Sequence, residues 1–230
     1  MVMFPCAGGN AQNYRRFSND IQAEVVRIEY SGHWSRYNEP VYDSFEDMIS
    51  DVKGYIKKKI SLHDHLFLFG HSMGACVAFE IAKQLIQENY DVKCLMISAC
   101  APVHEMNWAE IDVKSEIDVK KFLNRIRQVP EKVLNSSFFE DNLLHPIQND
   151  FRILANYIKS YRSDRPINCP IVCFQGRDDI LINNMSGWKS CTTKEIIVHT
   201  FPGGHFYFYE KNNYRAISKH INDIISQCGE

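Results

Sequence analysis

The sequence has no hydrophobic run that approaches the roughly 18 to 20 apolar residues needed to cross a bilayer. Its first residues, Met1 to Pro5, contain neither a basic region nor a long apolar stretch, so we expect no signal peptide and a cytoplasmic protein. There is also little excess charge of either sign: the net charge of −2 argues against a surface dominated by nucleic-acid binding. What remains is a globular chain whose 230 residues fit one domain, 1–230.

None of the eight cysteines forms a C-x-x-C pair, and no cluster of cysteine and histidine has the spacing of zinc ligands. Several cysteines lie in apolar segments, where a reduced thiol behaves as a small hydrophobic side chain. We therefore expect buried free thiols. The alternative is a redox pair of Cys169 and Cys173, which would share one face of a strand.

Internal repeats, low-complexity tracts and linkers are absent too. Short apolar runs instead alternate with longer amphipathic ones, which predicts an α/β fold with a mostly parallel sheet flanked by helices. The expected strands span residues 1–4, 24–29, 66–69, 92–98, 171–175 and 196–201. The expected helices span residues 10–21, 44–58, 73–87 and 214–226.

One region, from about residue 103 to 165, breaks this alternation because it contains only helix-like amphipathic segments. It is too long for a plain connection in a compact domain, so we expect a helical insertion over the sheet. One interpretation is that its apolar residues simply cover the core. The other is a lid over the carboxyl ends of the strands, with an inner face that lines an acyl pocket.

The strongest motif is Gly70-His71-Ser72-Met73-Gly74, between an apolar run and a helix-like segment. A G-x-S-x-G pentapeptide at such a junction is typical of a nucleophile elbow, in which the serine hydroxyl is lifted clear of the backbone. The helix that begins there directs free N–H groups at developing negative charge. Ser72 is therefore the candidate nucleophile, and the alternative is a tight structural turn.

A serine nucleophile needs a base to take its proton and an acid to orient that base. His205 follows an apolar strand in a glycine-containing loop and is the best placed of the nine histidines. For the acid, Asp178 and Asp179 both follow the strand expected at 171–175. Spacing from Gly176 favours Asp179, with residues 180–182 packed behind it, while Asp178 would cap or solvate the turn.

Gly8 and Gly9 follow the first expected strand. A loop of this kind can present a backbone N–H to the carbonyl oxygen that becomes an oxyanion. The candidate donors are the backbone N–H groups of Ala7 and of Met73, the residue after the nucleophile. The alternative is a flexible turn with Asn10 as a helix N-cap.

Taken together, these motifs resemble the type II thioesterases of polyketide and nonribosomal peptide biosynthesis and the related fatty-acid thioesterases. Residues 4–9 are similar to the family's F-P-x-A-G-G opening, and residues 70–75 and 203–206 to its G-H-S-M-G-A elbow and its G-G-H-F. Residues 30–40 resemble its Y-P-G-R-G-x-R-x-x-E-P stretch, and residues 143–151 loosely resemble its L-L-P-x-x-R-A-D-F. Ser31 departs from this pattern by replacing a proline, and His33 and Trp34 replace Arg-Gly, which leaves the contact of that arginine open.

The resemblance implies an α/β-hydrolase fold and a stand-alone editing thioesterase. Such an enzyme clears acyl groups from the phosphopantetheine arm of an acyl or peptidyl carrier protein through an acyl-serine, with no metal or organic cofactor and no nucleic acid or membrane partner. Competing functions are a small-molecule carboxylesterase, an acyltransferase, and a ligand receptor of the same fold with little turnover. We expect a monomer.

Carrier proteins of this family are typically acidic, so basic residues of the insertion could form part of a docking face. The alternative is a solvated helix face. The basic residues concerned are Lys114, Lys120, Lys121, Arg125 and Arg127.

Overall fold

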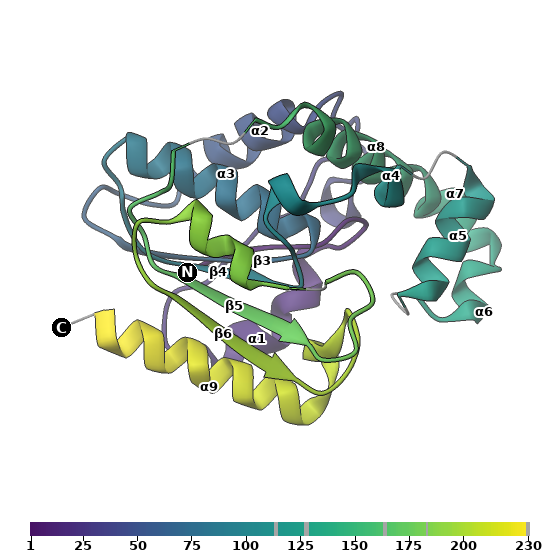
Figure 1. Ribbon diagram of the computed structural model, residues 1–230. Helices are drawn as coiled ribbons and strands as arrows, with labels where there is room; N and C mark the ends of the chain where they lie inside the picture. Colours follow the sequence, from purple (N-terminus) through teal and green to yellow (C-terminus); the bar gives the residue numbers. More distant parts are fainter. Residues whose placement is uncertain (113–114, 127–128, 163–164, 183, 229–230) are drawn as a thin grey trace.

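The computed structural model describes residues 1–230 except 113–114, 127–128, 163–164, 183 and 229–230 (Figure 1). Six strands form one sheet in the order β2-β1-β3-β4-β5-β6, and every pairing between them is parallel. The strands are β1 (Val2–Phe4), β2 (Val26–Arg27), β3 (His65–His71), β4 (Asp91–Ser98), β5 (Ile171–Gly176) and β6 (Ile196–Phe201). The predicted parallel sheet is confirmed, although β2 is shorter than expected.

Helices cover both faces of this sheet. The α-helices are α1 (Arg15–Asp20), α2 (Phe45–Lys57), α3 (Met73–Gln87), α4 (Trp108–Ile111), α5 (Glu116–Arg125), α6 (Glu131–Leu134), α7 (Ser137–Asn142), α8 (Leu144–Ser160) and α9 (Lys211–Cys228). Short 3₁₀ helices are η1 (Ala11–Tyr14), η2 (Trp34–Arg36), η3 (Val103–Glu105), η4 (Ser186–Cys191) and η5 (Tyr207–Tyr209). The single helix expected over 10–21 is wrong, because the segment divides into η1 and α1. Asn10 caps η1 by accepting the N–H of Gln12, as the alternative reading of that turn expected.

The two faces of the sheet carry two hydrophobic cores. Successive strand residues point to opposite faces, so Leu66 and Leu68 of β3 join one core, while Phe67 and Phe69 join the other. Helices α2, α3 and α8 lie over the first face, and α1 and α9 over the second (Figure 1). Helix α2 follows a Ser44 N-cap and buries one face against the sheet, as its amphipathic pattern predicts.

Between residues 103 and 165, the described residues form only helices and connecting turns. Helix α8 is anchored on the body of the protein: the ring of its Tyr157 stacks on Phe45 of α2 with centroids 4.2 Å apart. The Tyr157 hydroxyl also donates a hydrogen bond to Glu80 of α3, at 2.6 Å. Helices α5, α6 and α7 instead lie together at one end of the molecule (Figure 1).

All eight cysteines are free thiols, and seven of them are buried, as expected for small hydrophobic side chains. Cys169 and Cys173 are both among them and form no disulfide. Within the described parts of the chain, no helix is long and apolar enough to cross a membrane.

Candidate active site

The strand register places the carboxyl ends of several strands at one edge of the sheet. Phe4 of β1 lies beside Gly70 of β3, and Gly176 of β5 lies beside Phe201 of β6. The loops that follow β1, β3, β5 and β6 therefore emerge at the same edge, where open α/β sheets bind their ligands. These four loops contain the predicted residues Ala7, Ser72, Asp179 and His205, and Met73 is the first residue of α3, directly after the loop that carries Ser72.

Ser72 stands at the bend between β3 and α3 with φ of 56° and ψ of −123°, a backbone conformation that non-glycine residues rarely adopt. Two close approaches hold this bend. A Cβ atom on Gly70 would lie 2.1 Å from the carbonyl oxygen of Gly74, and one on Gly74 would lie 2.2 Å from that of Phe4. The two glycines of the motif are therefore required for α3 to pack against β1 and β3, as in a nucleophile elbow.

His205 follows β6 and Asp179 follows β5, and both side chains are buried. Nδ1 of His205 lies 2.8 Å from Oδ2 of Asp179, and the other carboxylate oxygen accepts the N–H of Leu181. Because the carboxylate accepts from Nδ1, it fixes the imidazole tautomer with a lone pair on Nε2. Nε2 has no hydrogen-bond partner among the described residues, which leaves it available as a base.

Asp178 makes different contacts from its neighbour. Its carboxylate accepts the N–H of Gly203 at 3.3 Å, and its own N–H bonds the Gly203 carbonyl. Asp178 thus braces the loop that carries His205, whereas Asp179 contacts the imidazole itself. The expectation that residues 180–182 all pack behind the acid is wrong for Ile180, which is 58% exposed.

His71, beside Ser72, is fully buried, and its contacts do not suit it to act as the base. Its Nδ1 lies 2.9 Å from the hydroxyl of Ser98, which in turn contacts the Tyr207 hydroxyl at 2.7 Å. Burial, and secondarily the nearby His205, hold the pKa of His71 well below its usual range. A neutral His71 places no positive charge beside the ring of His205, 5.1 Å away.

A chamber of about 150 Å³ lies in front of Ser72 and His205. The candidate oxyanion donors Ala7 and Met73 line it as well. The helical insertion supplies much of the remaining wall through Glu105, Met106, Asn107, Glu110, Phe122, Ile126, Phe151 and Leu154. The apolar residues Phe122, Phe151 and Leu154 make this wall suitable for an acyl group.

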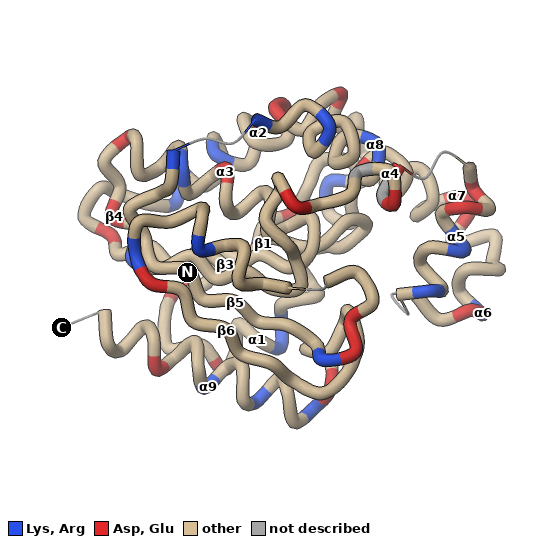
Figure 2. The backbone as a smooth tube through the Cα atoms, viewed as in Figure 1, with Lys and Arg blue, Asp and Glu red and all other residues tan. Residues whose placement is uncertain are grey.

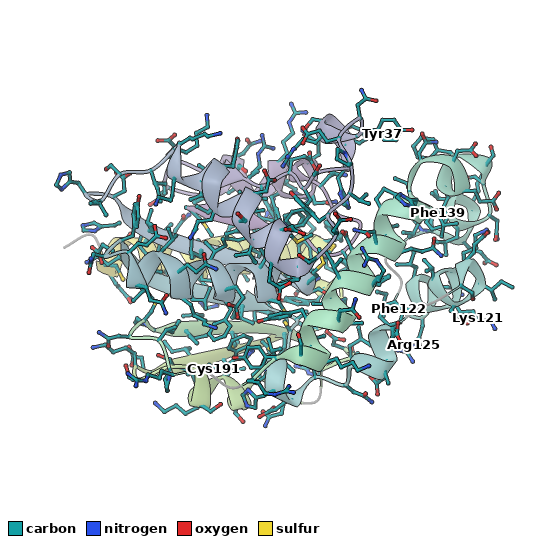
Figure 3. The ribbon with its side chains drawn as sticks, turned by 90° about the horizontal axis from the view of Figure 1, so that it is seen from above. Tyr37, Lys121, Phe122, Arg125, Phe139 and Cys191 are labelled. Carbon is teal, nitrogen blue, oxygen red and sulfur yellow. The ribbon has the colours of Figure 1, made fainter. Side chains whose placement is uncertain are left out.

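A second, larger cavity of about 510 Å³, here called the outer cavity, lies beside this chamber, and His205 and Ile126 line both. Arg125 of α5 and Tyr209 also line this outer cavity. Arg125 is the last residue of α5, and Figure 3 labels it with Lys121 and Phe122 of the same helix. The guanidinium of Arg125 lies over the Phe122 ring, 5.3 Å from its centroid.

Sequence reasoning assigned no role to two buried residues beside the Gly8 loop. Asp150 of α8 accepts the N–H of Gly8 at 2.8 Å, and the same oxygen lies 3.0 Å from Nε2 of His33. His33 lies in residues 30–40 and Asp150 in residues 143–151, two of the segments that resemble family motifs. That resemblance was the only sign in the sequence that the two residues have a role. His33, where this chain departs from the motif it resembles, therefore contacts an acidic residue of the insertion.

The basic residues considered for docking differ in their surroundings. Lys120 forms ion pairs with Glu116 and Glu140, while Lys121 and Arg125 are exposed. Lys114 and Arg127 lie outside the described residues. Figure 2 shows acidic as well as basic residues on α5, α6 and α7, so this end of the molecule is not uniformly basic.

A parallel sheet with a serine at the bend after β3 and an Asp–His pair after β5 and β6 is the arrangement of the α/β-hydrolase fold. The predicted fold class is confirmed. The comparisons with known proteins give the family: a model described as the thioesterase domain matches residues 1–225. The chain belongs to this family and is a thioesterase, an enzyme that hydrolyses thioesters.

Several curated relatives match the chain over most of its length. The thioesterase TesA of Mycobacterium marinum is 28% identical over 98% of this chain and 88% of its own length. The gramicidin S biosynthesis protein GrsT of Aneurinibacillus migulanus is 30% identical, over 91% of this chain and 83% of that protein. The human medium-chain S-acyl fatty acid synthase thioesterase is 27% identical, over 96% and 85%.

Solved structures agree on the fold. RedJ, a thioesterase of the prodiginine biosynthetic pathway in Streptomyces coelicolor, superposes with a TM-score of 0.86 at 24% identity, over 97% of this chain and 84% of that one. ClbQ, from the colibactin NRPS/PKS pathway, also gives 0.86, at 22% identity over 99% and 97%. The resemblance to type II thioesterases is thus confirmed.

Proposed function

We propose that this thioesterase is a stand-alone editing enzyme that hydrolyses acyl groups from the phosphopantetheine arm of carrier proteins through an acyl-serine. The observation that carries the proposal is the common chamber of Ser72 and His205, with Asp179 bonded behind the imidazole. Relatives named for gramicidin S biosynthesis and solved structures from NRPS/PKS pathways support the carrier-bound substrate.

In this proposal, the Ser72 hydroxyl oxygen attacks the thioester carbonyl carbon while Nε2 of His205 takes the hydroxyl proton. The N–H groups of Ala7 and Met73 would donate to the oxyanion. The C–S bond then breaks, and the imidazolium returns the proton to the leaving thiolate. Asp179 stabilises the imidazolium and keeps its ring oriented.

Water completes the reaction. His205 takes a proton from water as the water oxygen attacks the acyl-serine carbonyl, and then returns the proton to Ser72 as the ester bond breaks. The products are a carboxylic acid and the free thiol of the arm. Because a thiolate is a good leaving group, the reaction needs an activated nucleophile and oxyanion donors more than it needs a strong general acid.

The two cavities suggest where the acyl group and the phosphopantetheine arm of a carrier-bound substrate would lie. We propose that the acyl group occupies the inner chamber, and that the arm passes His205 through the outer cavity lined by Arg125. The exposed side chains of Lys121 and Arg125 would then face an acidic carrier protein. We further propose that the enzyme acts as a cytoplasmic monomer.

The test is hydrolysis of a panel of acyl groups, each presented on a phosphopantetheinylated carrier protein and as a p-nitrophenyl ester. Ser72→Ala is run in parallel. We expect the wild type to hydrolyse the carrier-bound thioesters faster than the free esters, and we expect Ser72→Ala to lose this hydrolysis. Preference for the free esters would favour a small-molecule carboxylesterase. Binding without turnover, in a protein whose Ser72 resists a fluorophosphonate, would favour a ligand receptor.

A further inference from the structure

The Gly8 loop, residues 5–9, is held at both ends by groups that sequence reasoning did not assign. The Tyr30 hydroxyl donates to the carbonyl oxygen of Pro5 at 3.0 Å, and Asp150 accepts the N–H of Gly8 at 2.8 Å. Ala7, a candidate oxyanion donor, lies between these two attachments. The position of its N–H relative to Ser72 therefore depends on them.

Helix α8 also fixes this loop by packing. Gly8 has φ of +68°, and a Cβ atom there would lie 2.3 Å from Cγ1 of Ile147. Ile147 and Asp150 are one helical turn apart on α8, so one helix both presses on Gly8 and bonds its N–H. Because Tyr157 anchors α8 to the body of the protein, the loop is attached through α8 to α3.

The His33 side chain is the partner of Asp150, and its contacts define its charge. Nε2 lies 3.0 Å from the Asp150 carboxylate, and Nδ1 lies 3.0 Å from the carbonyl oxygen of Ser31. Both partners are acceptors, so both ring nitrogens must carry hydrogen, which makes the buried ring an imidazolium. The imidazolium balances the negative charge of Asp150, which is only 1% exposed.

The groups around His33 agree with this charge. Burial, the largest single effect, lowers the pKa of His33, but the charge of Asp150 and the hydrogen bonds outweigh it and raise the pKa to about 9. The carboxylate of Glu29 acts in the same direction. Arg36 of the adjoining turn is directed to Glu39 and Asp51 instead.

Two neighbours of Asp150 and His33, Cys6 and Tyr30, have pKa values above that of His33. Burial, and then Asp150, raise the pKa of Cys6 to about 12. Burial, again followed by Asp150, raises the pKa of Tyr30 well above its ordinary value. Neither group therefore gains or loses a proton near pH 9, where His33 does.

We propose that Asp150 and His33 are positioning residues that hold the Gly8 loop. This hold depends on one proton, because the cation beside Asp150 is an imidazolium, which can lose its charge. The inference rests on the proposed function, since it assumes that Ala7 donates to an oxyanion. A neutral His33 has a single N–H, so it must give up either Ser31 or Asp150. Asp150 would then be a buried carboxylate without its cation, which weakens its hold on Gly8.

The test measures kcat and KM against pH for the wild type, His33→Gln, His33→Arg and Asp150→Asn. The substrate is an acyl-N-acetylcysteamine thioester, which avoids carrier docking. The wild type should lose kcat as pH rises through about 9, since the raised pKa means that the charged form exists below it. His33→Gln and Asp150→Asn should lower kcat at pH 7 by about 10-fold or more, with KM changed less, and should lack this alkaline decline.

His33→Arg is the rescue variant, because its charge persists at high pH. It should keep kcat at pH 9.5 where the wild type has declined. His65→Gln is the matched control: it removes a histidine–carboxylate contact, His65 with Asp91, that lies at the start of β3 and does not touch the loop, and it should leave the pH profile unchanged. If His33→Gln keeps the wild-type profile, or if the variants change KM alone, the proposal is overturned, whether or not His33→Arg folds.

Labelling of Ser72 by a fluorophosphonate separates this inference from the proposed function. The labelled phosphorus also carries an oxygen that the oxyanion donors would bind, so the labelling rate reports on the loop without any thioester. A wild type that resists the label at every pH would contradict the nucleophilic serine. A wild type that is labelled with the same pH dependence as His33→Gln would contradict only the role of His33 and Asp150.

Discussion

His205 and Asp179 are 26 residues apart in the chain and follow different strands, yet Nδ1 of the first lies 2.8 Å from Oδ2 of the second. Asp178, immediately before Asp179, bonds the backbone of Gly203 instead. The register of β5 with β6 brings the two loops together, and a single step along the chain decides which carboxylate meets the imidazole.

This difference gives the first prediction. Asp179→Asn should lower kcat by about 10³-fold or more, because the amide favours the wrong tautomer of His205. Asp178→Asn should lower kcat by only about threefold, since it weakens a brace of the loop. Steady-state kinetics on one acyl thioester, with circular dichroism to verify folding, compares the two. Equal losses would assign Asp178 a role that its contacts do not explain.

The elbow glycines predict a difference in stability. Gly74→Ala places a Cβ atom 2.2 Å from the Phe4 carbonyl oxygen, so it should lower the free energy of unfolding by about 3 kcal/mol. Gly54→Ala in α2 is the matched control, because a Cβ atom there has no neighbour within 4 Å. The control should raise stability by about 0.5 to 1 kcal/mol. Urea unfolding measures both, and a stable Gly74→Ala would contradict the close packing of α3 on β1.

The wall of the inner chamber predicts substrate preference. Phe122 lines the chamber and packs edge-to-face on Phe151, with centroids 5.1 Å apart. Phe122→Ala should shift kcat/KM toward longer acyl groups by several fold, because each buried methylene contributes about 0.8 kcal/mol. Ile117→Ala, on the same helix but 63% exposed, should leave the preference unchanged. An unchanged chain-length profile in Phe122→Ala would place the acyl group elsewhere.

The exposed basic residues of α5 predict an effect limited to carrier-bound substrate. The double variant Lys121→Glu, Arg125→Glu should lower kcat/KM on the carrier-bound thioester by about 5- to 10-fold at low salt and less at high salt. Turnover of the N-acetylcysteamine thioester, which lacks the carrier protein and most of the arm, should change much less. Arg215→Glu, Lys219→Glu has the same spacing on α9 and is the control. Equal activity of both double variants on the carrier would leave α5 a solvated face.

The pKa of His33 also predicts a dependence of folding stability on pH. Its value of about 9 in the folded protein exceeds the ordinary 6.5. The contribution of this charge, at most about 3 kcal/mol, is therefore fully present below about pH 6.5 and lost as pH rises through about 9. Chemical unfolding at pH 6.5, 8 and 9.5 should show this decline in the wild type relative to His33→Gln. Parallel curves for the two proteins would show that the ring is neutral.

The features that the sequence predicted are those with local signals. The parallel sheet follows from the alternation of short apolar and longer amphipathic segments. Ser72 and its elbow follow from a motif of five consecutive residues, Gly70 to Gly74, that stands between an apolar run and a helix-like segment. Residues 103–165 stand out because they lack a strand signal, and the described part of them is helical.

The features that were missed depend on contacts between distant parts of the chain. His33 and Asp150 are 117 residues apart, and neither segment alone indicates that one will neutralise the other. The apolar side chain of Ile180 predicts a core residue, but the conformation of its loop leaves that side chain exposed. The division of residues 10–21 into η1 and α1 reflects the hydrogen bonds at Asn10 and the packing of Tyr14, which periodicity does not encode.

The chamber has walls of two origins. Ala7, Ser72 and His205 come from loops at the edge of the sheet, whereas Phe122, Ile126, Phe151 and Leu154 come from the insertion. Mutations in one set need not disturb the other. Related enzymes can therefore change their acyl preference through substitutions in one contiguous segment of the chain. A chimera that exchanges this segment between relatives, with an aspartate kept at position 150, should combine the donor's acyl preference with the host's chemistry.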